Sequence, residues 1–418
     1  MRTPVVVRRF VPVVFAVAFL AQPLAAQEVP APASREEVQQ LRDEVRALKE
    51  ALAAMEARLA LIPAPAAVPA PEPALQPTPP PAPDLSPLAS SAIPAGSSKV
   101  FNPDIAVIGD FLGAAGRNPS PDAPPSLELH EAEASFQAIV DPYARADFFL
   151  TFGPDEIGVE EGFITFPTVP GGLLLKVGKM RDGFGKVDGL HNHLLPWTDR
   201  PLVTQNLTGG EDALADYGVS VSRLIPNRLL FLEATAQIYR GESAVFQAPS
   251  RGDLAYVGHL RGYRDLGEST NLDLGGSFAS GHNGVTEGST TRLFGVDATF
   301  RYRPLRRAIY KRFIARTELV WSRREQEAAA ADAFGLYASA EYQFARRWFA
   351  GLRYDHSERA TDPSLVDKGG SFLLTWWPSE FSQIRGQYRH VRFGEQRSAD
   401  EFLFQFLFSI GAHGAHAF

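Results

Sequence analysis

The sequence predicts an all-β fold: a sixteen-stranded antiparallel transmembrane β-barrel, preceded by a short coiled-coil helix and a Pro-rich linker. The first observation is the final segment, EFLFQFLFSIGAHGAHAF, where Phe402, Phe404, Phe406 and Phe408 occupy alternate positions. Side chains alternate across a strand, so these rings share one face. The second observation is that this alternation recurs throughout residues 101–418. The third is that no apolar run of about 18 residues, the length of a spanning helix, follows the N-terminal segment.

Residues 1–26 have the pattern of a secretory signal peptide. Arginines at positions 2, 8 and 9 precede an apolar stretch from Phe10 to Ala21, and Pro23 to Ala26 supplies small residues for cleavage. We expect this segment to be removed. A short transmembrane anchor is the alternative, but a span needs about 20 apolar residues. The chain has no cysteine, which excludes disulfides and a lipid-modified cysteine.

Residues 34–61 are predicted to form a coiled-coil oligomerisation helix. Apolar residues repeat at spacings of three and four from Val38 to Leu59, and Ser34 with Glu37 makes a capping box. A single solvated helix is the alternative.

Residues 62–98 are rich in Pro and Ala, so we expect an extended periplasmic linker. The formal net charge is −7 and no basic block is present, which argues against a nucleic-acid partner.

Residues 101–418 divide into short segments with one apolar and one polar face. Apolar side chains outward and polar side chains inward are typical of a barrel in a lipid bilayer. Tight turns follow several even-numbered segments and longer links follow the odd ones, which is the alternation of periplasmic turns and outside loops. We place the strands approximately at Ile105–Ala115, Leu127–Val140, Ala144–Gly153, Gly158–Thr168, Leu173–Arg181, Asp216–Leu224, Leu229–Arg240, Leu254–Asp265, Asn271–Ser280, Thr291–Arg303, Tyr310–Ser322, Ala333–Phe344, Arg347–Ser357, Gly370–Trp377, Phe381–Phe393 and Glu401–Phe418.

The longest link, residues 181–215, follows the fifth strand. This position, with a heptad segment ahead of sixteen strands, resembles the phosphate-selective (O/P-type) porins. The resemblance implies a homotrimer whose long loop folds into the lumen and narrows it. A terminal strand ending on Phe418 is similar to the signal by which outer-membrane barrels reach their assembly machinery. These features together predict that the barrel is located in the outer membrane of a Gram-negative cell and that the coil and linker lie in the periplasm.

Charged residues on the loop and on the predicted inward faces are candidates for the pore constriction. Carboxylates dominate the early strands, at Glu131, Glu133, Asp147 and Glu161, whereas arginines dominate the later ones. Opposed charges would create a transverse field that sets ion preference. Salt bridges within the wall are the equal alternative. The constriction candidates are Asp188, Asp199, Glu211, Asp212, Arg301, Arg316, Arg353, Arg385 and Arg389.

A metal site is a second hypothesis for the same loop. His191 and His193 lie two residues apart among loop carboxylates, and imidazole with carboxylate suits Zn²⁺. Solvated loop histidines are the alternative. The stretches FNPDIAVIGDF and LHNHLLPWTDRPLVTQNLTGGEDALADYGVSVSRLIP resemble proteins described as zinc-regulated outer-membrane receptors, some under a TonB-dependent label. The barrel lacks the length and the plug of a TonB-dependent transporter, which has 22 strands.

Three functions are therefore considered. The first is a porin-like channel for passive diffusion of small hydrophilic solutes or ions. The second is an outer-membrane receptor for zinc or a zinc complex, and the third is a structural tether of the envelope that uses the coil and linker. An enzyme is not expected, because no set of nucleophile, base and orienting group is recognisable. We expect no resident cofactor, with Zn²⁺ as the one candidate ligand.

Overall fold

The computed structural model describes residues 103–121, 123–153 and 157–411. The predicted signal peptide, coiled coil and Pro-rich linker, as well as Phe418, lie outside these residues and stay predictions. In the part of the chain that is described, no helix is long and apolar enough to cross a membrane.

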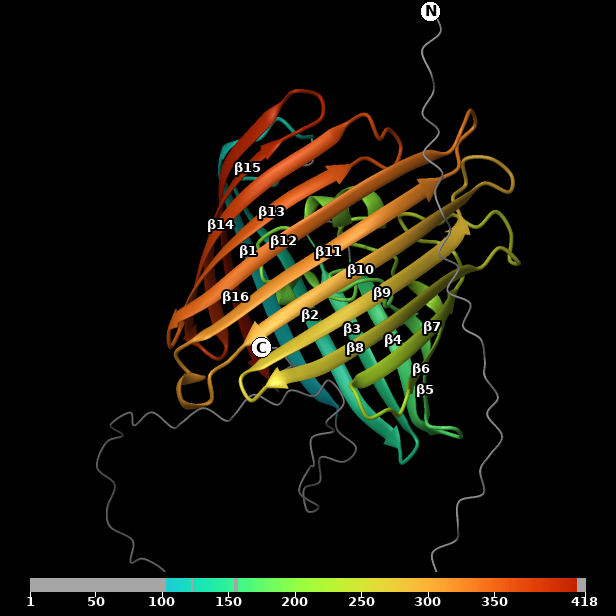
Figure 1. Ribbon diagram of the computed structural model, residues 1–418, viewed down its shortest axis with the longest axis horizontal. Helices are drawn as coiled ribbons and strands as arrows, with labels where there is room; N and C mark the ends of the chain where they lie inside the picture. The colour runs from blue at the N-terminus through green and yellow to red at the C-terminus, as the bar shows by residue number, and fades with distance from the viewer. Residues whose placement is uncertain (1–102, 122, 154–156, 412–418) are drawn as a thin grey trace, which may run out of the picture. The chain divides into compact units, whose positions relative to one another are not determined.

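Sixteen strands close into one antiparallel barrel in which every strand pairs with its neighbours in sequence and β1 pairs with β16 (Figure 1). The predicted fold class of a sixteen-stranded antiparallel barrel is confirmed. The strands are β1 (Asp104–Arg117), β2 (Leu127–Asp141), β3 (Ala144–Phe152), β4 (Ile157–Val169), β5 (Leu173–Met180), β6 (Asp216–Leu224), β7 (Phe231–Tyr239), β8 (Ala255–Gly267), β9 (Thr270–His282), β10 (Thr290–Tyr302), β11 (Arg312–Arg324), β12 (Ala331–Ala345), β13 (Trp348–Glu358), β14 (Val366–Ser379), β15 (Ser382–Arg392) and β16 (Ser398–Gly411).

Each predicted segment overlaps one strand, but several predicted ends are wrong by a few residues. β14 begins at Val366 rather than at Gly370, and β16 begins at Ser398 rather than at Glu401. In both places the added residues, 366–369 and 398–400, mix polar and apolar side chains but still pair in the ladder, because backbone pairing does not require a regular apolar face.

The alternation of side chains follows the prediction on the outer face. On β10, Phe294 and Val296 point outward and are 50% and 49% exposed, whereas Asp297 and Thr299 lie inside the barrel and are buried. Connections also alternate. Those after the odd-numbered strands include the long segment 181–215, whereas β2 and β3 are joined through two residues. We name the two ends of the barrel the long-loop rim and the short-turn rim.

The lumen is not uniformly polar, which differs from the expectation. Residues 181–215, the inner loop, carry fully buried apolar side chains such as Phe184, Val187 and Trp197. These pack against inward-facing apolar residues of the wall, among them Val257 on β8 and Val320 on β11, in one hydrophobic cluster. The inner loop is therefore packed inside the barrel, and its short helical turns η1 (Asn192–Leu194) and η2 (Thr204–Thr208) are enclosed by strands (Figure 1).

Candidate functional site

The inner loop is tied at its base by Arg181, which follows the last residue of β5. Its backbone N–H donates to Glu161 Oε1 at 2.7 Å, and its Nε donates to Glu160 Oε1 at 2.9 Å. The guanidinium also donates two hydrogen bonds of 3.0 Å to the backbone oxygen of Glu211, near the other end of the loop. The buried Arg181 thus links β4 to both the first and the last part of the inner loop.

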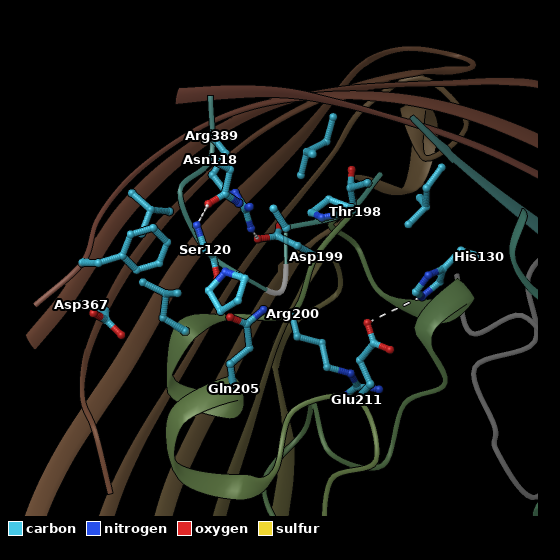
Figure 2. A pocket seen from close by; sticks show the side chains of 18 of the residues that line it. Asn118, Ser120, His130, Thr198, Asp199, Arg200, Gln205, Glu211, Asp367 and Arg389 are labelled. Atoms are coloured by element: carbon cyan, nitrogen blue, oxygen red, sulfur yellow. Dashed lines mark hydrogen bonds and ion pairs between the residues drawn. The ribbon is translucent and has the colours of Figure 1, made fainter. Parts of the chain in front are cut away.

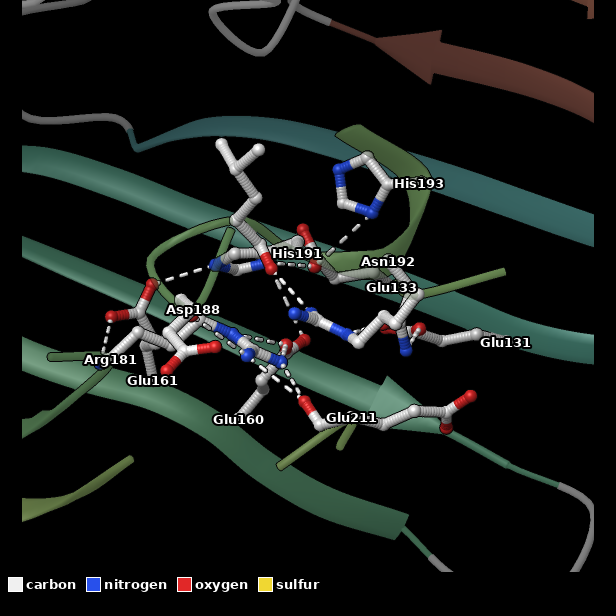
Figure 3. A network of polar contacts seen from close by, with 12 residues as sticks. Glu131, Glu133, Glu160, Glu161, Arg181, Asp188, His191, Asn192, His193 and Glu211 are labelled. Atoms are coloured by element: carbon white, nitrogen blue, oxygen red, sulfur yellow. Dashed lines mark hydrogen bonds and ion pairs between the residues drawn. The ribbon is translucent and has the colours of Figure 1, made fainter. Parts of the chain in front are cut away.

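His191 lies between two strands of the wall (Figure 3). Its Nδ1 is 2.6 Å from Glu133 Oε2 on β2, and its Nε2 is 2.7 Å from Glu161 Oε2 on β4. Glu160 Oε2 lies 3.4 Å from the same Nδ1. Because both ring nitrogens face carboxylates, the ring is held as an imidazolium that donates to each side. His191 therefore fastens the loop across β2 and β4.

Two β-bulges bring these carboxylates together. Along the β3–β4 ladder, Phe149 pairs with Glu161 and Leu150 pairs with Val159, so Glu160 is the extra residue. Along the β1–β2 ladder, Asp110 pairs with Glu131 and Phe111 with Leu129, so His130 is extra. A bulge redirects side chains that strict alternation would place on opposite faces. Consecutive acids at positions 160 and 161 can both reach His191 for this reason.

The electrostatics of the cluster favour a charged histidine. Burial of the ring acts to lower the pKa of His191, but hydrogen bonds to Glu133 and Glu161 outweigh it and raise the pKa to about 10. Two cations, His191 and Arg181, face four carboxylates. The acid–histidine cluster consists of Glu131, Glu133, Glu160, Glu161, His191 and His193.

The donor set of this cluster fits a divalent metal ion. Ligand atoms of Glu133, His191 and His193 all lie within 4.8 Å of one another, as do those of Glu131, Glu133 and Glu160. Zinc sites use imidazole nitrogen and carboxylate oxygen at about 2.0–2.2 Å, so ligands on one ion lie a little over 3 Å apart. Glu131 Oε1 and Glu160 Oε2 are buried without a hydrogen-bond donor among the described residues. An ion would supply the missing positive charge.

On the opposite side, Asp199 fixes the loop to the later strands. Its carboxylate accepts hydrogen bonds from Arg353 Nη2 at 3.0 Å and from Arg389 Nη1 at 2.8 Å. Burial acts to raise the pKa of Asp199, but the charges of these two arginines outweigh it and lower the pKa to about 2. Arg385 donates to the backbone oxygen of Leu195 at 3.0 Å. These contacts form the Asp199 clamp, and all three arginines are buried in it or beside it.

A cavity of about 860 Å³ lies where the inner loop meets β1, β2, β15 and β16 (Figure 2). Charges of both signs line it. Asp199 and Arg389 lie on one side, and His130 faces Glu211 at 3.6 Å on the other. Arg200 reaches the cavity as well, although its guanidinium donates to backbone oxygens of Val187 and Leu190 within the loop. The cavity is large enough, and its lining is polar enough, to hold a hydrated solute.

The remaining predicted constriction residues are dispersed. Asp188 is buried and accepts a hydrogen bond of 2.9 Å from Thr208 Oγ1, so it belongs to the interior of the loop. Asp212 is exposed at the end of the loop. Arg301 and Arg316 lie inward on β10 and β11 toward the short-turn rim, where Arg301 is 3.7 Å from Asp273. The structure thus groups Asp199, Arg353, Arg385 and Arg389, and their part in ion selectivity stays a prediction.

Sequence reasoning missed the acidic partners of His191 as a group, and it missed Arg181, Glu160 and His130 altogether. Glu133 and Glu161 were expected to point inward, but nothing in their spacing shows that a loop histidine reaches both. The adjacent pair at positions 160 and 161 breaks the alternation of β4. That break is the one signal that could have indicated a bulge.

Comparison with known proteins supports the fold. No family model matches the sequence. A protein of Aquifex aeolicus (strain VF5), described as uncharacterized, is 28% identical over 390 residues, which cover 77% of this chain and 81% of that protein. The DcaP outer-membrane channel of Acinetobacter baumannii has a TM-score of 0.50 at 10% identity, over 74% of this chain and 97% of its own.

Two further solved structures give the same result. The trimer form of OmpT, an outer-membrane protein of Vibrio cholerae, has a TM-score of 0.50 at 11% identity and covers 74% of this chain and 99% of its own. Salmonella typhi OmpF in complex with daunomycin has a TM-score of 0.50 at 9% identity, over 74% and 97% of the two chains. At such identities the likeness shows the barrel fold of outer-membrane proteins. These comparisons give no support to the resemblance to zinc-regulated receptors.

Proposed function

We propose that this chain is an outer-membrane, porin-like channel that passes small hydrophilic solutes or ions by diffusion, as a homotrimer. The observation that carries the proposal is the polar cavity of about 860 Å³ left beside a loop folded into a closed sixteen-stranded barrel. The hydrophobic cluster joins the loop to the wall from β4 to β14. We therefore assign the passage to the side where β15, β16, β1 and β2 line the cavity.

Cysteine labelling tests this passage, because the natural chain has no cysteine. Leu112 lines the cavity from β1, and the neighbouring Phe111 points to the outer face. In proteoliposomes, a charged methanethiosulfonate reagent is expected to slow solute flux through Leu112→Cys and to leave Phe111→Cys unchanged. Equal effects on the two variants, or no flux through the unlabelled protein, would contradict the assignment.

The acid–histidine cluster supports a second candidate function, a receptor for zinc or another divalent cation. The supporting observation is the convergence of Glu133, His191 and His193 with two further buried carboxylates. To bind an ion, His191 has to release one of its carboxylate partners, so metal binding and loop anchoring compete. Titration calorimetry with Zn²⁺ tests this candidate. His191→Gln with His193→Gln should abolish binding, whereas His282→Gln with His390→Gln, a half-buried and an exposed histidine outside the cluster, should not. Heat release that survives the first substitution would exclude the cluster.

A further inference from the structure

The neighbouring strands β13, β14 and β15 (Figure 1) carry two cations and a histidine on their outward face. His356 pairs with Lys368 across the β13–β14 ladder, and Lys368 pairs with Arg392 across the β14–β15 ladder. All three are near the ends of their strands at the long-loop rim, and Lys368 and Arg392 are exposed. They form one row, which we call the cationic row.

The cationic row has no neutralising carboxylate among the described residues. Two other outward basic side chains at this rim do have one: Arg323 lies 3.3 Å from Asp332, and His390 lies 2.7 Å from Asp400. Like charges directly opposite each other on adjacent strands destabilise the pairing. An anion supplied from outside the chain would remove that repulsion at Lys368 and Arg392.

An apolar groove of about 550 Å³ lies next to the row, toward the middle of these three strands and of the adjacent β12. Ala338, Ala340 and Gly370 are the small residues of the groove, and a Cβ added to Gly370 would meet only the backbone oxygen of Arg353, at 4.0 Å. The larger apolar residues that line it are Leu352, Tyr354, Phe372 and Tyr388, which are 61%, 50%, 49% and 49% exposed. Its shape and chemistry suit a hydrocarbon chain.

We propose that this outward face binds a phosphorylated, acylated glycolipid of the outer leaflet. Its phosphate would lie between Lys368 and Arg392, and one acyl chain would occupy the groove beside Gly370. Longer loops face the cell exterior in bacterial barrels, which places the row at the level of outer-leaflet headgroups. Cations near a membrane surface attract anionic headgroups, and the acyl chain fills apolar surface that small side chains leave open.

A two-fold contact with a second copy of the chain fits this surface less well than a lipid does. In a two-fold contact the same patch meets itself, so each cationic row would approach that of the other copy. The inference rests on the proposed outer-membrane location of the barrel. It does not depend on conduction, so a barrel that binds the glycolipid but passes no solute would overturn the proposed channel function alone.

Native mass spectrometry of the full-length chain tests the proposal, with a diphosphorylated lipid A and phosphatidylglycerol as probes. Lys368→Gln with Arg392→Gln should weaken lipid A binding by at least about tenfold, since each surface cation contributes to attraction. The matched control is Arg306→Gln with Arg307→Gln, which removes the same charge from exposed positions at the short-turn rim. This control should bind lipid A as the natural chain does.

Gly370→Leu separates the groove from the charges. The added side chain enters open space on the outer face, so the barrel should fold, as judged by its heat-dependent gel mobility, and lipid A binding should fall with the cationic row intact. The proposal is overturned if the charge variant binds lipid A as tightly as its control, if phosphatidylglycerol binds as tightly as lipid A, or if Gly370→Leu leaves binding unchanged.

Discussion

Replacing Asp199 by Asn should release the part of the inner loop that the Asp199 clamp holds. Asn keeps the size of the side chain but removes the charge that Arg353 and Arg389 share. Each arginine retains a second carboxylate, Asp355 and Glu401 respectively, so the barrel wall itself should stay folded. The effect is expected in the loop and not in the strand ladders.

The magnitude follows from the pKa of Asp199, which lies at about 2 in place of 3.8. This difference corresponds to roughly 2 to 3 kcal/mol in favour of the charged carboxylate. Because the folded pKa is lowered, the contribution is present above pH 3.8 and is lost as the pH falls toward 2. At neutral pH the full contribution is lost in Asp199→Asn, and local opening should increase by roughly thirtyfold to 150-fold.

Hydrogen exchange measured by mass spectrometry reports this opening. The amide of Thr198 donates to Gln387 Oε1 at 2.9 Å and that of Leu202 donates to Asp355 Oδ1 at 3.3 Å, so a peptide spanning them monitors the clamp. Asp212→Asn, an exposed carboxylate on the same loop, is the matched control. If the amides of this peptide exchange in both variants at the rate measured for the natural chain, the clamp does not hold the loop and the reasoning is refuted.

Three further predictions concern the loop and the lumen. Gly185→Ala should loosen the start of the loop, because the added Cβ would lie 1.6 Å from Glu318 Oε1; faster amide exchange at the start of the loop would report this. Gly210→Ala is the control, since Gly210 also has a positive φ but its added Cβ would enter open space, and it should have the smaller effect. The pKa of His191 is raised from 6.5 to about 10, so its anchoring is complete below pH 6.5 and is lost as the pH rises through 10; loop release between pH 6 and 8 would contradict this. Arg316→Glu reverses an inward charge on β11 and should shift the reversal potential in a salt gradient toward cations, whereas an unchanged potential would exclude that residue from the field.

The barrel could be predicted because its signal is repeated in every strand. A lipid-facing side that alternates with a polar side specifies strand number, strand position and the order of long and short links. The ends of β14 and β16 were predicted less well, since backbone pairing continues where the apolar pattern stops. These are errors of boundary and not of architecture.

The interior was predictable only in part. His191 and Asp199 were recognised as candidates from residue type and loop position, but their partners come from β2, β4, β13 and β15, far away in sequence. Local spacing carries no information on such contacts. The apolar lumen surface was missed for a related reason. Val257 and Leu293 are apolar side chains that point inward, which departs from the expected polar inner face and can be explained only when the loop that covers them is known.

Single-channel recording in planar bilayers tests the central claim most directly. If the cavity beside the inner loop is a diffusion pathway through each of three barrels, the purified protein should open stably, in steps of three, with conductance that rises with salt concentration. A protein that inserts as folded barrels but gives no conductance steps would contradict the account, because the inner loop would then close the lumen completely.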